Sequence, residues 1–228
     1  MNTELFYKEK GKGFPLILLH GNGENCDYFK NQMEFFSDKY RVIAVDTRGH
    51  GKSPRGTAPF SIQQFADDLY KFMNRLDISK AIILGFSDGA NIAMKFALKY
   101  QNKIEKLILN GGNLNTKGFK AFIQIPIEIG YRMTKVFSAK CDKARKSKEM
   151  LGLMVNDPNI DVIDLSAIKV PTLVIAGTRD MIKENHTKLI ANSIPNAELK
   201  IINGTHFIAN TESEIFNKIV NDFLNEDF

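Results

Sequence analysis

The chain has 228 residues, 43% of them hydrophobic and 25% charged, which is a composition typical of a globular protein. This length favours one domain over two, and the composition excludes a disordered, collagen-like or disulfide-rich chain. The 31 Lys and Arg residues exceed the 26 Asp and Glu residues by a net charge of +5, which by itself would point to nucleic acid or an acidic surface.

Short, continuous apolar runs recur along the chain, as expected of parallel strands that are buried on both faces. After an edge strand at 5–8, they lie at 15–19, 41–45, 81–84, 104–109, 172–176 and 197–202. Helical patterns cover 25–38, 62–76 after a Ser61 cap, 88–100, 184–193 and 212–225 after Thr211. This alternation predicts right-handed crossovers and a doubly wound, mostly parallel α/β sheet.

The interval from about 111 to 165 breaks the alternation of strands and helices. It carries apolar residues on several faces, contains Pro126, which would kink or split a helix, and continues into a basic stretch at 140–148. We expect a short helical cap inserted into a single domain that spans 1–228.

The positive charge is concentrated in this cap. Residues 111–150 include nine Lys and Arg against three Asp and Glu, a net of +6, while the rest of the chain sums to −1. These cations either form a solvated helix face or lie at an entrance and attract an anionic acyl substrate. Because the remainder of the chain is balanced, the charge does not argue for a nucleic-acid partner.

The two cysteines, Cys26 and Cys141, are too few for a disulfide framework and lack metal-ligand spacing, so we expect buried or incidental thiols. The start of the chain has no basic region, and the first apolar run, 14–19, is too short for a signal sequence or a membrane span. A cytoplasmic location without stable membrane insertion is therefore expected. The sequence sets no oligomeric state.

The predicted strand at 81–84 leads through Gly85-Phe86-Ser87-Asp88-Gly89 directly into a helical pattern. A serine displayed on a sharp, strained turn between a strand and a helix needs neighbours without a Cβ, which explains the two glycines. We interpret Ser87 as a nucleophile, although a serine in an ordinary glycine-rich turn would give the same letters.

A serine hydroxyl needs a base, and the base needs a third group to orient it. His206 follows the last predicted strand, where its loop would reach the carboxyl edge of the sheet, and is the candidate base. Asp180, three residues after the glycine that ends the preceding strand, is the candidate acid. Taken singly, each could equally be an ordinary loop residue.

An acyl-transfer site also needs N–H donors for the developing oxyanion. Asp88, directly after Ser87, offers one backbone N–H at a helix N-terminus, and the turn containing Asn22 offers another. The alternative is that the neighbouring glycines only shape the loop and that the Asp88 carboxylate complements the helix dipole.

Other motifs were considered and rejected. The segment 46–53 lacks the first glycine of a phosphate-binding loop, and Gly21 and Gly23 lack the third glycine of a dinucleotide fingerprint. There is no His-Glu-x-x-His motif and no Cys/His cluster with metal spacing, so neither a metal nor any other cofactor is expected.

Together these motifs resemble the α/β-hydrolase family, in its order and at its usual separations. They are His20-Gly21-Asn22-Gly23, Asp46 to Ser53, Gly85 to Gly89, Gly177-Thr178-Arg179-Asp180 and Gly204-Thr205-His206. The resemblance implies Ser87 as nucleophile, Asp180 as acid, His206 as base and the Asn22 and Asp88 amides as oxyanion hole. It also implies that the turn 46–53 is structural and that His50 is not catalytic.

We therefore expect a cofactor-free serine hydrolase that cleaves a carboxylic ester or thioester of a small-molecule acyl substrate. Carbon–carbon bond hydrolysis, amide cleavage or a perhydrolase side reaction would use the same three residues. A ligand-binding protein that keeps this fold without turnover is the alternative from another functional class. Dehalogenases and epoxide hydrolases are disfavoured, because their elbow nucleophile is Asp.

Overall fold

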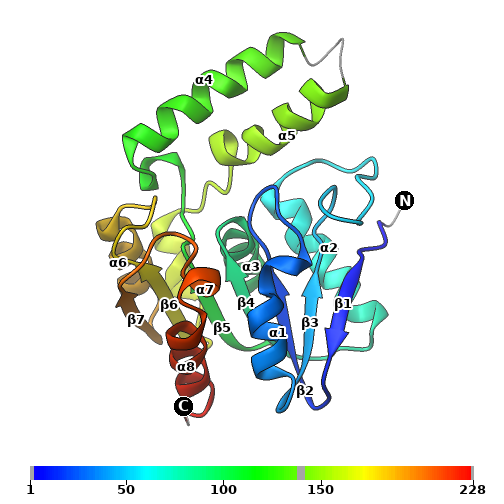
Figure 1. Cartoon of the computed structure of the whole chain (residues 1–228), viewed down its shortest axis with the longest axis vertical. Coiled ribbons are helices and arrows are strands. Elements are labelled where there is room, and N and C mark those ends of the chain that lie inside the picture. Colours follow the sequence, from blue (N-terminus) through cyan, green and yellow to red (C-terminus); the bar gives the residue numbers. More distant parts are fainter. Residues whose placement is uncertain (1–2, 138–141, 227–228) are drawn as a thin grey trace.

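The computed structural model describes residues 3–137 and 142–226, so Cys141 lies outside the described residues, whereas Cys26 is buried. The strands are β1 (Tyr7–Lys10), β2 (Phe14–Leu19), β3 (Tyr40–Val45), β4 (Ala81–Phe86), β5 (Ile104–Asn110), β6 (Thr172–Gly177) and β7 (Ala197–Ile202). They form one sheet in the order β1-β3-β2-β4-β5-β6-β7 (Figure 1). Only the edge strand β1 is antiparallel to its neighbour, so the predicted mostly parallel α/β sheet is confirmed.

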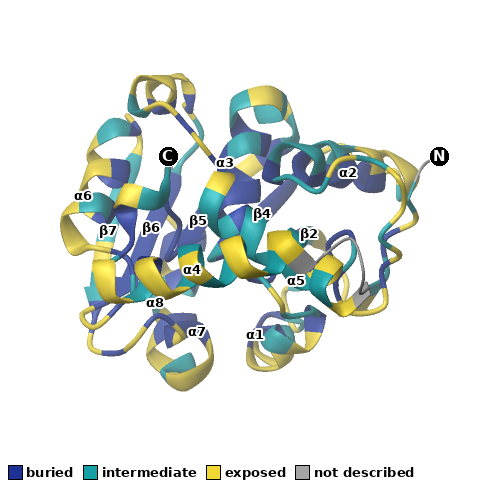
Figure 2. Cartoon of the chain, turned by 90° about the horizontal axis from the view of Figure 1, so that it is seen from above, coloured by how far each residue is buried: buried dark blue, intermediate teal, exposed yellow. Residues whose placement is uncertain are grey.

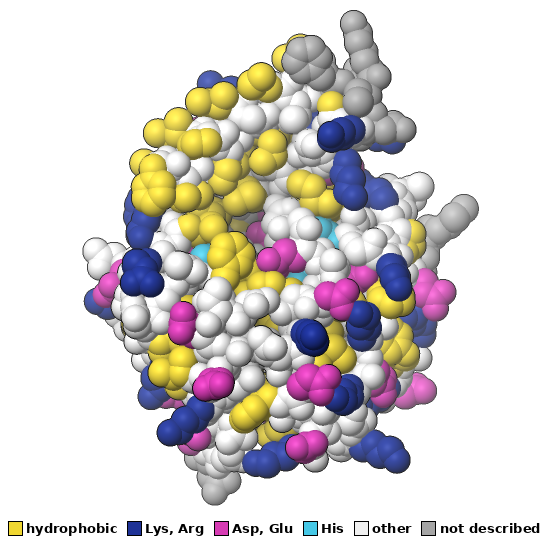
Figure 3. Space-filling model, viewed as in Figure 1, with side chains coloured by type: hydrophobic (Ala, Val, Ile, Leu, Met, Phe, Trp, Pro, Cys, Tyr) yellow, Lys and Arg dark blue, Asp and Glu magenta, His cyan; other side chains and the backbone are white. Residues whose placement is uncertain are grey.

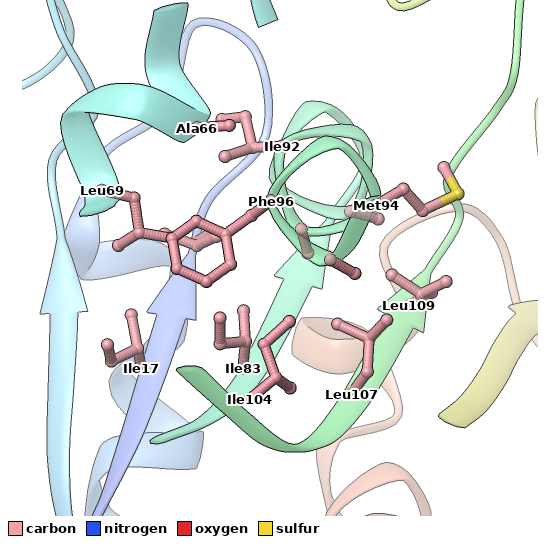
Figure 4. Close-up of a cluster of buried hydrophobic side chains, with 14 of the residues drawn as sticks. Ile17, Ala66, Leu69, Ile83, Ile92, Met94, Phe96, Ile104, Leu107 and Leu109 are labelled. Carbon is pink, nitrogen blue, oxygen red and sulfur yellow. The ribbon is translucent and has the colours of Figure 1, made fainter. Parts of the chain in front are cut away.

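Helices cover both faces of this sheet. One face packs against α2 (Ile62–Arg75), α3 (Asp88–Tyr100) and α6 (Glu184–Ser193), and the other against α1 (Lys30–Phe36), α7 (Ile208–Thr211) and α8 (Ser213–Leu224). Two further helices, α4 (Ala121–Phe137) and α5 (Asp142–Asn156), lie beyond the end of the sheet. Alternate strand residues point to opposite faces. Ile17 and Ile83 pack with α2 and α3 (Figure 4), while Leu16 and Leu84 pack with the buried side chains of α1 and α8. The view from above shows buried strands between partly exposed helices (Figure 2).

Local hydrogen bonds set the helix ends. Ser61 caps α2 as predicted, because its side chain accepts the N–H of Gln64. The helix expected at 25–38 is instead a 3-10 turn, Cys26–Phe29, followed by α1, since the Asn25 side chain accepts the Asp27 N–H and starts a tighter turn. Thr211 does not cap α8 but ends α7, and its hydroxyl donates to the carbonyl of Phe207 at 3.3 Å.

The two helices α4 and α5, called the cap helices below, pack on each other above the carboxyl ends of the strands (Figure 1). Pro126 does not split α4, contrary to one of the two expectations for it. It is the sixth residue of the helix, so α4 lacks the bond that an N–H at this position would donate to the carbonyl of Phe122, yet the helix continues to Phe137. Across residues 3–137 and 142–226, no helix is long and apolar enough to cross a bilayer.

The turn after β3 is held by buried polar contacts. The Asp46 carboxylate accepts the N–H of Cys26 and of Lys52, both at 2.7 Å. The Arg48 guanidinium donates to both oxygens of Asp68 at 2.7 Å, with only 1% and 3% of the two side chains exposed. Because Asp68 belongs to α2, this ion pair fixes the turn against the helix layer.

Replacing Asp68 by Asn tests how far the fold depends on this pair. The Arg48 charge would stay buried without its partner, so we expect the free energy of unfolding to fall by about 3 kcal/mol. Urea denaturation followed by circular dichroism measures it. Glu105→Gln is the matched control, since its pair with Lys80 is about half exposed, and should cost less than about 1 kcal/mol. Equal losses in the two variants would contradict the argument.

Candidate active site

The predicted site residues all follow carboxyl ends of parallel strands. Asn22 follows β2, Ser87 follows β4, Asp180 follows β6 and His206 follows β7. In parallel sheets these ends meet along one edge, which is where ligands bind in open α/β folds. Ser87, His206 and Asn22 line one cavity there, beneath the cap helices.

Ser87 sits on the predicted strained turn. Its φ of 54° and ψ of −118° place a non-glycine residue in a costly backbone region, and its N–H donates to the carbonyl of Asn110 at 2.8 Å. A Cβ on Gly85 would lie 2.2 Å from the carbonyl oxygen of Gly89, and one on Gly89 would lie 1.9 Å from that of Leu19. Both positions therefore require glycine, because α3 starts in direct contact with the strands.

His206 and Asp180 form a buried pair. His206 Nδ1 lies 2.7 Å from Asp180 Oδ1, and the two side chains are 4% and 3% exposed. The same oxygen accepts the N–H of Ile182 at 2.9 Å. Because Nδ1 faces a carboxylate, it carries the hydrogen, and Nε2 is left as an acceptor. Nε2 is buried and has no hydrogen-bond partner within the described residues.

Glycine at the end of β5 makes room for this pair. Gly111 has a φ of +65°, and a Cβ there would lie 2.7 Å from His206 Cε1 and 3.3 Å from Asp180 Oδ2. A side chain at Gly111 would thus push the imidazole and the carboxylate away from the sheet.

The loop that carries Asn22 is anchored from both sides. His20 Nδ1 donates to the carbonyl of Gly21 at 2.7 Å, and its Nε2 accepts the N–H of Thr47 at 3.0 Å. Burial, with a smaller effect from His50, lowers the pKa of His20 to about 4, so the ring is neutral and keeps both bonds at neutral pH. On the other side, the side-chain amide of Asn22 donates from Nδ2 to the carbonyl of Met150 in α5 at 2.8 Å.

The backbone N–H groups of Asn22 and Asp88 are available to a ligand, since neither has a hydrogen-bond acceptor within 3–137 and 142–226. Asp88 opens α3, where the helix dipole favours negative charge. Its own side chain is buried, and Asn91 donates to Oδ1 at 3.2 Å. Burial raises the pKa of Asp88 to about 7, against the opposite effect of Asn91.

The cavity has a volume of about 200 Å³ and an apolar wall. Its lining combines loop residues of the body with three residues of α5: Gly21, Asn22, Glu24, Phe86, Ser87, Met150, Leu151, Met154, Met181, His206 and Phe207. It opens in the hollow between the cap helices and the body that faces the viewer in Figure 3.

Glu24 is a site residue that the motifs did not identify. Its carboxylate accepts the N–H of Gly21 at 3.1 Å and lines the cavity beside Phe86. Burial raises its pKa to about 6, partly offset by the Gly21 N–H and by His206. The sequence contains one signal, because a Glu three residues after Gly21 is spaced to close that turn. It does not predict that the side chain lines the same cavity as Ser87.

Within residues 3–137 and 142–226, no cap cation lines this cavity. Arg145 and Lys146 line a neighbouring hollow of about 360 Å³, where Arg55 pairs with Glu149, and the two hollows share only Met150. A larger hollow, about 660 Å³, lies at the opposite, amino ends of β5 and β6 and contains none of the predicted site residues. In the part of the chain that the structure describes, no three His, Cys, Asp or Glu residues are grouped to hold a metal ion.

Known proteins of similar sequence and structure include a chloroperoxidase, a lactonase and an esterase. A putative non-heme chloroperoxidase of Synechocystis is 27% identical over 261 aligned residues, which cover 97% of this chain and 95% of that protein. The enol-lactonase of Burkholderia xenovorans superposes with a TM-score of 0.83 at 22% identity, over 98% of this chain and 97% of the other. An esterase of Exiguobacterium antarcticum gives 0.82 at 21% identity, over 98% and 96%.

The likeness to the two crystal structures concerns the fold, because both identities are below 25%. The family model of the alpha/beta hydrolase fold matches residues 15–138, more than half of the chain. That segment includes the anchored loop after β2, the structural turn after β3 and the strained turn at Ser87. The chain is therefore a member of the α/β-hydrolase family.

Proposed function

We propose that this hydrolase cleaves a carboxylic ester or thioester through an acyl-enzyme on Ser87. One observation carries the proposal. Ser87 stands at a positive φ in the same cavity as His206, whose Nδ1 is held by Asp180 and whose buried Nε2 has no other partner. A strained serine in one cavity with an imidazole that a carboxylate orients is the arrangement that nucleophilic acyl transfer needs.

In the proposed mechanism, Ser87 Oγ attacks the carbonyl carbon while His206 Nε2 takes its proton. Asp180 stabilises the imidazolium that forms, and the N–H groups of Asn22 and Asp88 stabilise the oxyanion. When the tetrahedral intermediate collapses, the leaving alcohol or thiol receives the proton from His206. Water, activated by the same imidazole, then releases the acid and restores Ser87.

The names of the similar proteins are compatible with an ester but include other bonds, since carbamate hydrolases and meta-cleavage product hydrolases also match. An esterase and a lactonase, which opens a cyclic ester, are among the structures that superpose, and a chloroperoxidase is a relative by sequence. Carbon–carbon and amide hydrolysis and perhydrolysis are the alternatives with the same residues. Pure ligand binding is disfavoured, because the strain at Ser87, typically about 1–3 kcal/mol, would bring a binding protein no benefit.

The size and lining of the cavity favour a substrate with a small, apolar acyl group. Its volume of about 200 Å³ is below the roughly 300–1,000 Å³ of pockets that enclose drug-sized ligands. Met150, Leu151, Met154 and Phe207 offer it an apolar wall. Glu24 contributes a carboxylate, so the site favours neutral over anionic acyl groups once that carboxyl is ionised. We further propose that the cap helices belong to an inserted unit over about 111–165 within one domain, 1–228.

Substitution of Ser87 by Ala tests the nucleophile. We expect kcat on p-nitrophenyl esters to fall by at least about 10⁴-fold and labelling by a fluorophosphonate probe to disappear. A series from acetate to palmitate, run beside acyl thioesters, should show the highest kcat/KM for the shortest chains. Ser166→Ala, at an exposed serine, is the control and should keep both activity and labelling. Persistent labelling of the Ser87 variant would exclude the assignment.

Substitution of Glu24 by Gln tests the charge of the cavity. Above pH 6 the carboxyl is ionised and repels anionic substrates, whereas at pH 5 it is mostly protonated, because burial raises its pKa to about 6. At pH 8 we expect the variant to raise kcat/KM for p-nitrophenyl succinate relative to p-nitrophenyl butyrate by about fivefold, or ~1 kcal/mol. At pH 5 the two proteins should give nearly the same ratio.

Using a ratio of two substrates cancels the effect of pH on His206 itself. Glu34→Gln removes the same charge from α1, outside the cavity, and should leave the ratio unchanged at both pH values. If Glu24→Gln has no effect at pH 8, the carboxylate does not face the acyl group.

A further inference from the structure

The helix α4 carries a row of large apolar side chains on its outer surface. Five of them are more than half exposed: Phe122 (70%), Ile125 (56%), Ile129 (54%), Met133 (59%) and Val136 (73%). We call these five residues the outer stripe. Figure 3 shows hydrophobic side chains following one another along the outer edge of the cap.

The spacing of the outer stripe places all five residues on one side of the helix. At about 100° per residue they fall within an arc of roughly 100°, and the stripe is about 21 Å long. An arc of this width normally faces a core. Here Gln124, on the opposite side of α4, is the buried residue, and α5 packs below the helix, so the stripe points away from the protein.

Cations lie near this stripe. Arg132 and Lys135 are exposed on α4 itself, and Lys117 is exposed just before it. Glu149 is paired with Arg55 of the body, and Glu128 on α4 reduces the positive charge of that helix by one.

The outer stripe and the cations near it help to decide between two possible partners of this surface, a second copy of the chain and a membrane. A second copy of the chain would bring two caps together, each with a net charge of +6 over 111–150, and like charges disfavour that contact. An anionic lipid surface accepts the apolar stripe between its headgroups and attracts the cations beside it. A helix with Phe, Ile, Met and Val on one face and Lys and Arg at its border is the kind that lies in the plane of a membrane interface.

We propose that the outer stripe of α4, with the cations that border it, docks the protein on a membrane surface containing anionic lipid. The contact is peripheral. The stripe would enter the headgroup region, and the body, with the carboxyl edge of the sheet beneath the cap, would stay in water. None of the five stripe residues lines the Ser87 cavity, so docking uses a surface distinct from the proposed catalytic site.

Co-sedimentation of the whole chain with sucrose-loaded vesicles tests the proposal. We expect binding to vesicles of phosphatidylcholine with about one third phosphatidylglycerol, weaker binding to phosphatidylcholine alone, and loss of binding in high salt. Replacing both Ile125 and Ile129 by Ser should reduce the partition coefficient by at least about tenfold. Thermal unfolding of the double variant should match that of the wild type, because both side chains are exposed.

Ile163→Ser is the matched control. Ile163 is 74% exposed but lies outside the cap helices, and its variant should bind vesicles like the wild type. Equal binding by the double variant, or no binding by the wild type, would overturn the proposal. A concentration-dependent dimer in sedimentation equilibrium that the double variant abolishes would also overturn it and assign the stripe to a second copy.

Discussion

The close approach of α3 to the carboxyl end of β2 determines the geometry of the whole site. Where a Cβ on Gly89 would meet the carbonyl of Leu19 at 1.9 Å, the helix and the strand touch through their backbones. The chain between β4 and α3 then has too little room for a relaxed turn, so Ser87 is forced to a positive φ. The strand against which α3 is pressed also leads into the loop of Asn22. One contact thus fixes the backbone at Ser87 and the start of the loop that carries Asn22.

The elements that sequence predicted well are those whose signal is local. Continuous apolar runs reveal strands buried on both faces, and Ser61 caps α2 by accepting the N–H of Gln64, three residues along the chain. The glycines around Ser87 and the Gly177 to Asp180 segment mark strand ends by the same local logic. Because parallel strands end at one edge, the meeting of His206 with Asp180 could be predicted without knowledge of any side-chain contact.

The features that sequence missed depend on packing between distant segments. Thr211 has the spacing of a helix cap, yet it ends α7. Its hydroxyl therefore donates a hydrogen bond to the carbonyl of Phe207 and does not cap α8. Glu24 is polar and sits in a loop, which predicts exposure, but the body and α5 enclose it. The positive net charge of the chain does not predict the charge of the cavity. Among the described residues, the ionisable side chains that line it are those of Glu24 and His206.

The hydrogen bond from the side-chain amide of Asn22 to the carbonyl of Met150 links the loop after β2 to α5. Met150 also contributes to the wall of the cavity, so a displacement of α5 wide enough to admit a bulky ligand must stretch or break this bond. The Asn22 loop would then lose its upper anchor while His20 still holds it from below. Widening the cavity and releasing the upper anchor of the Asn22 loop are therefore mechanically coupled, since the same bond to α5 limits both.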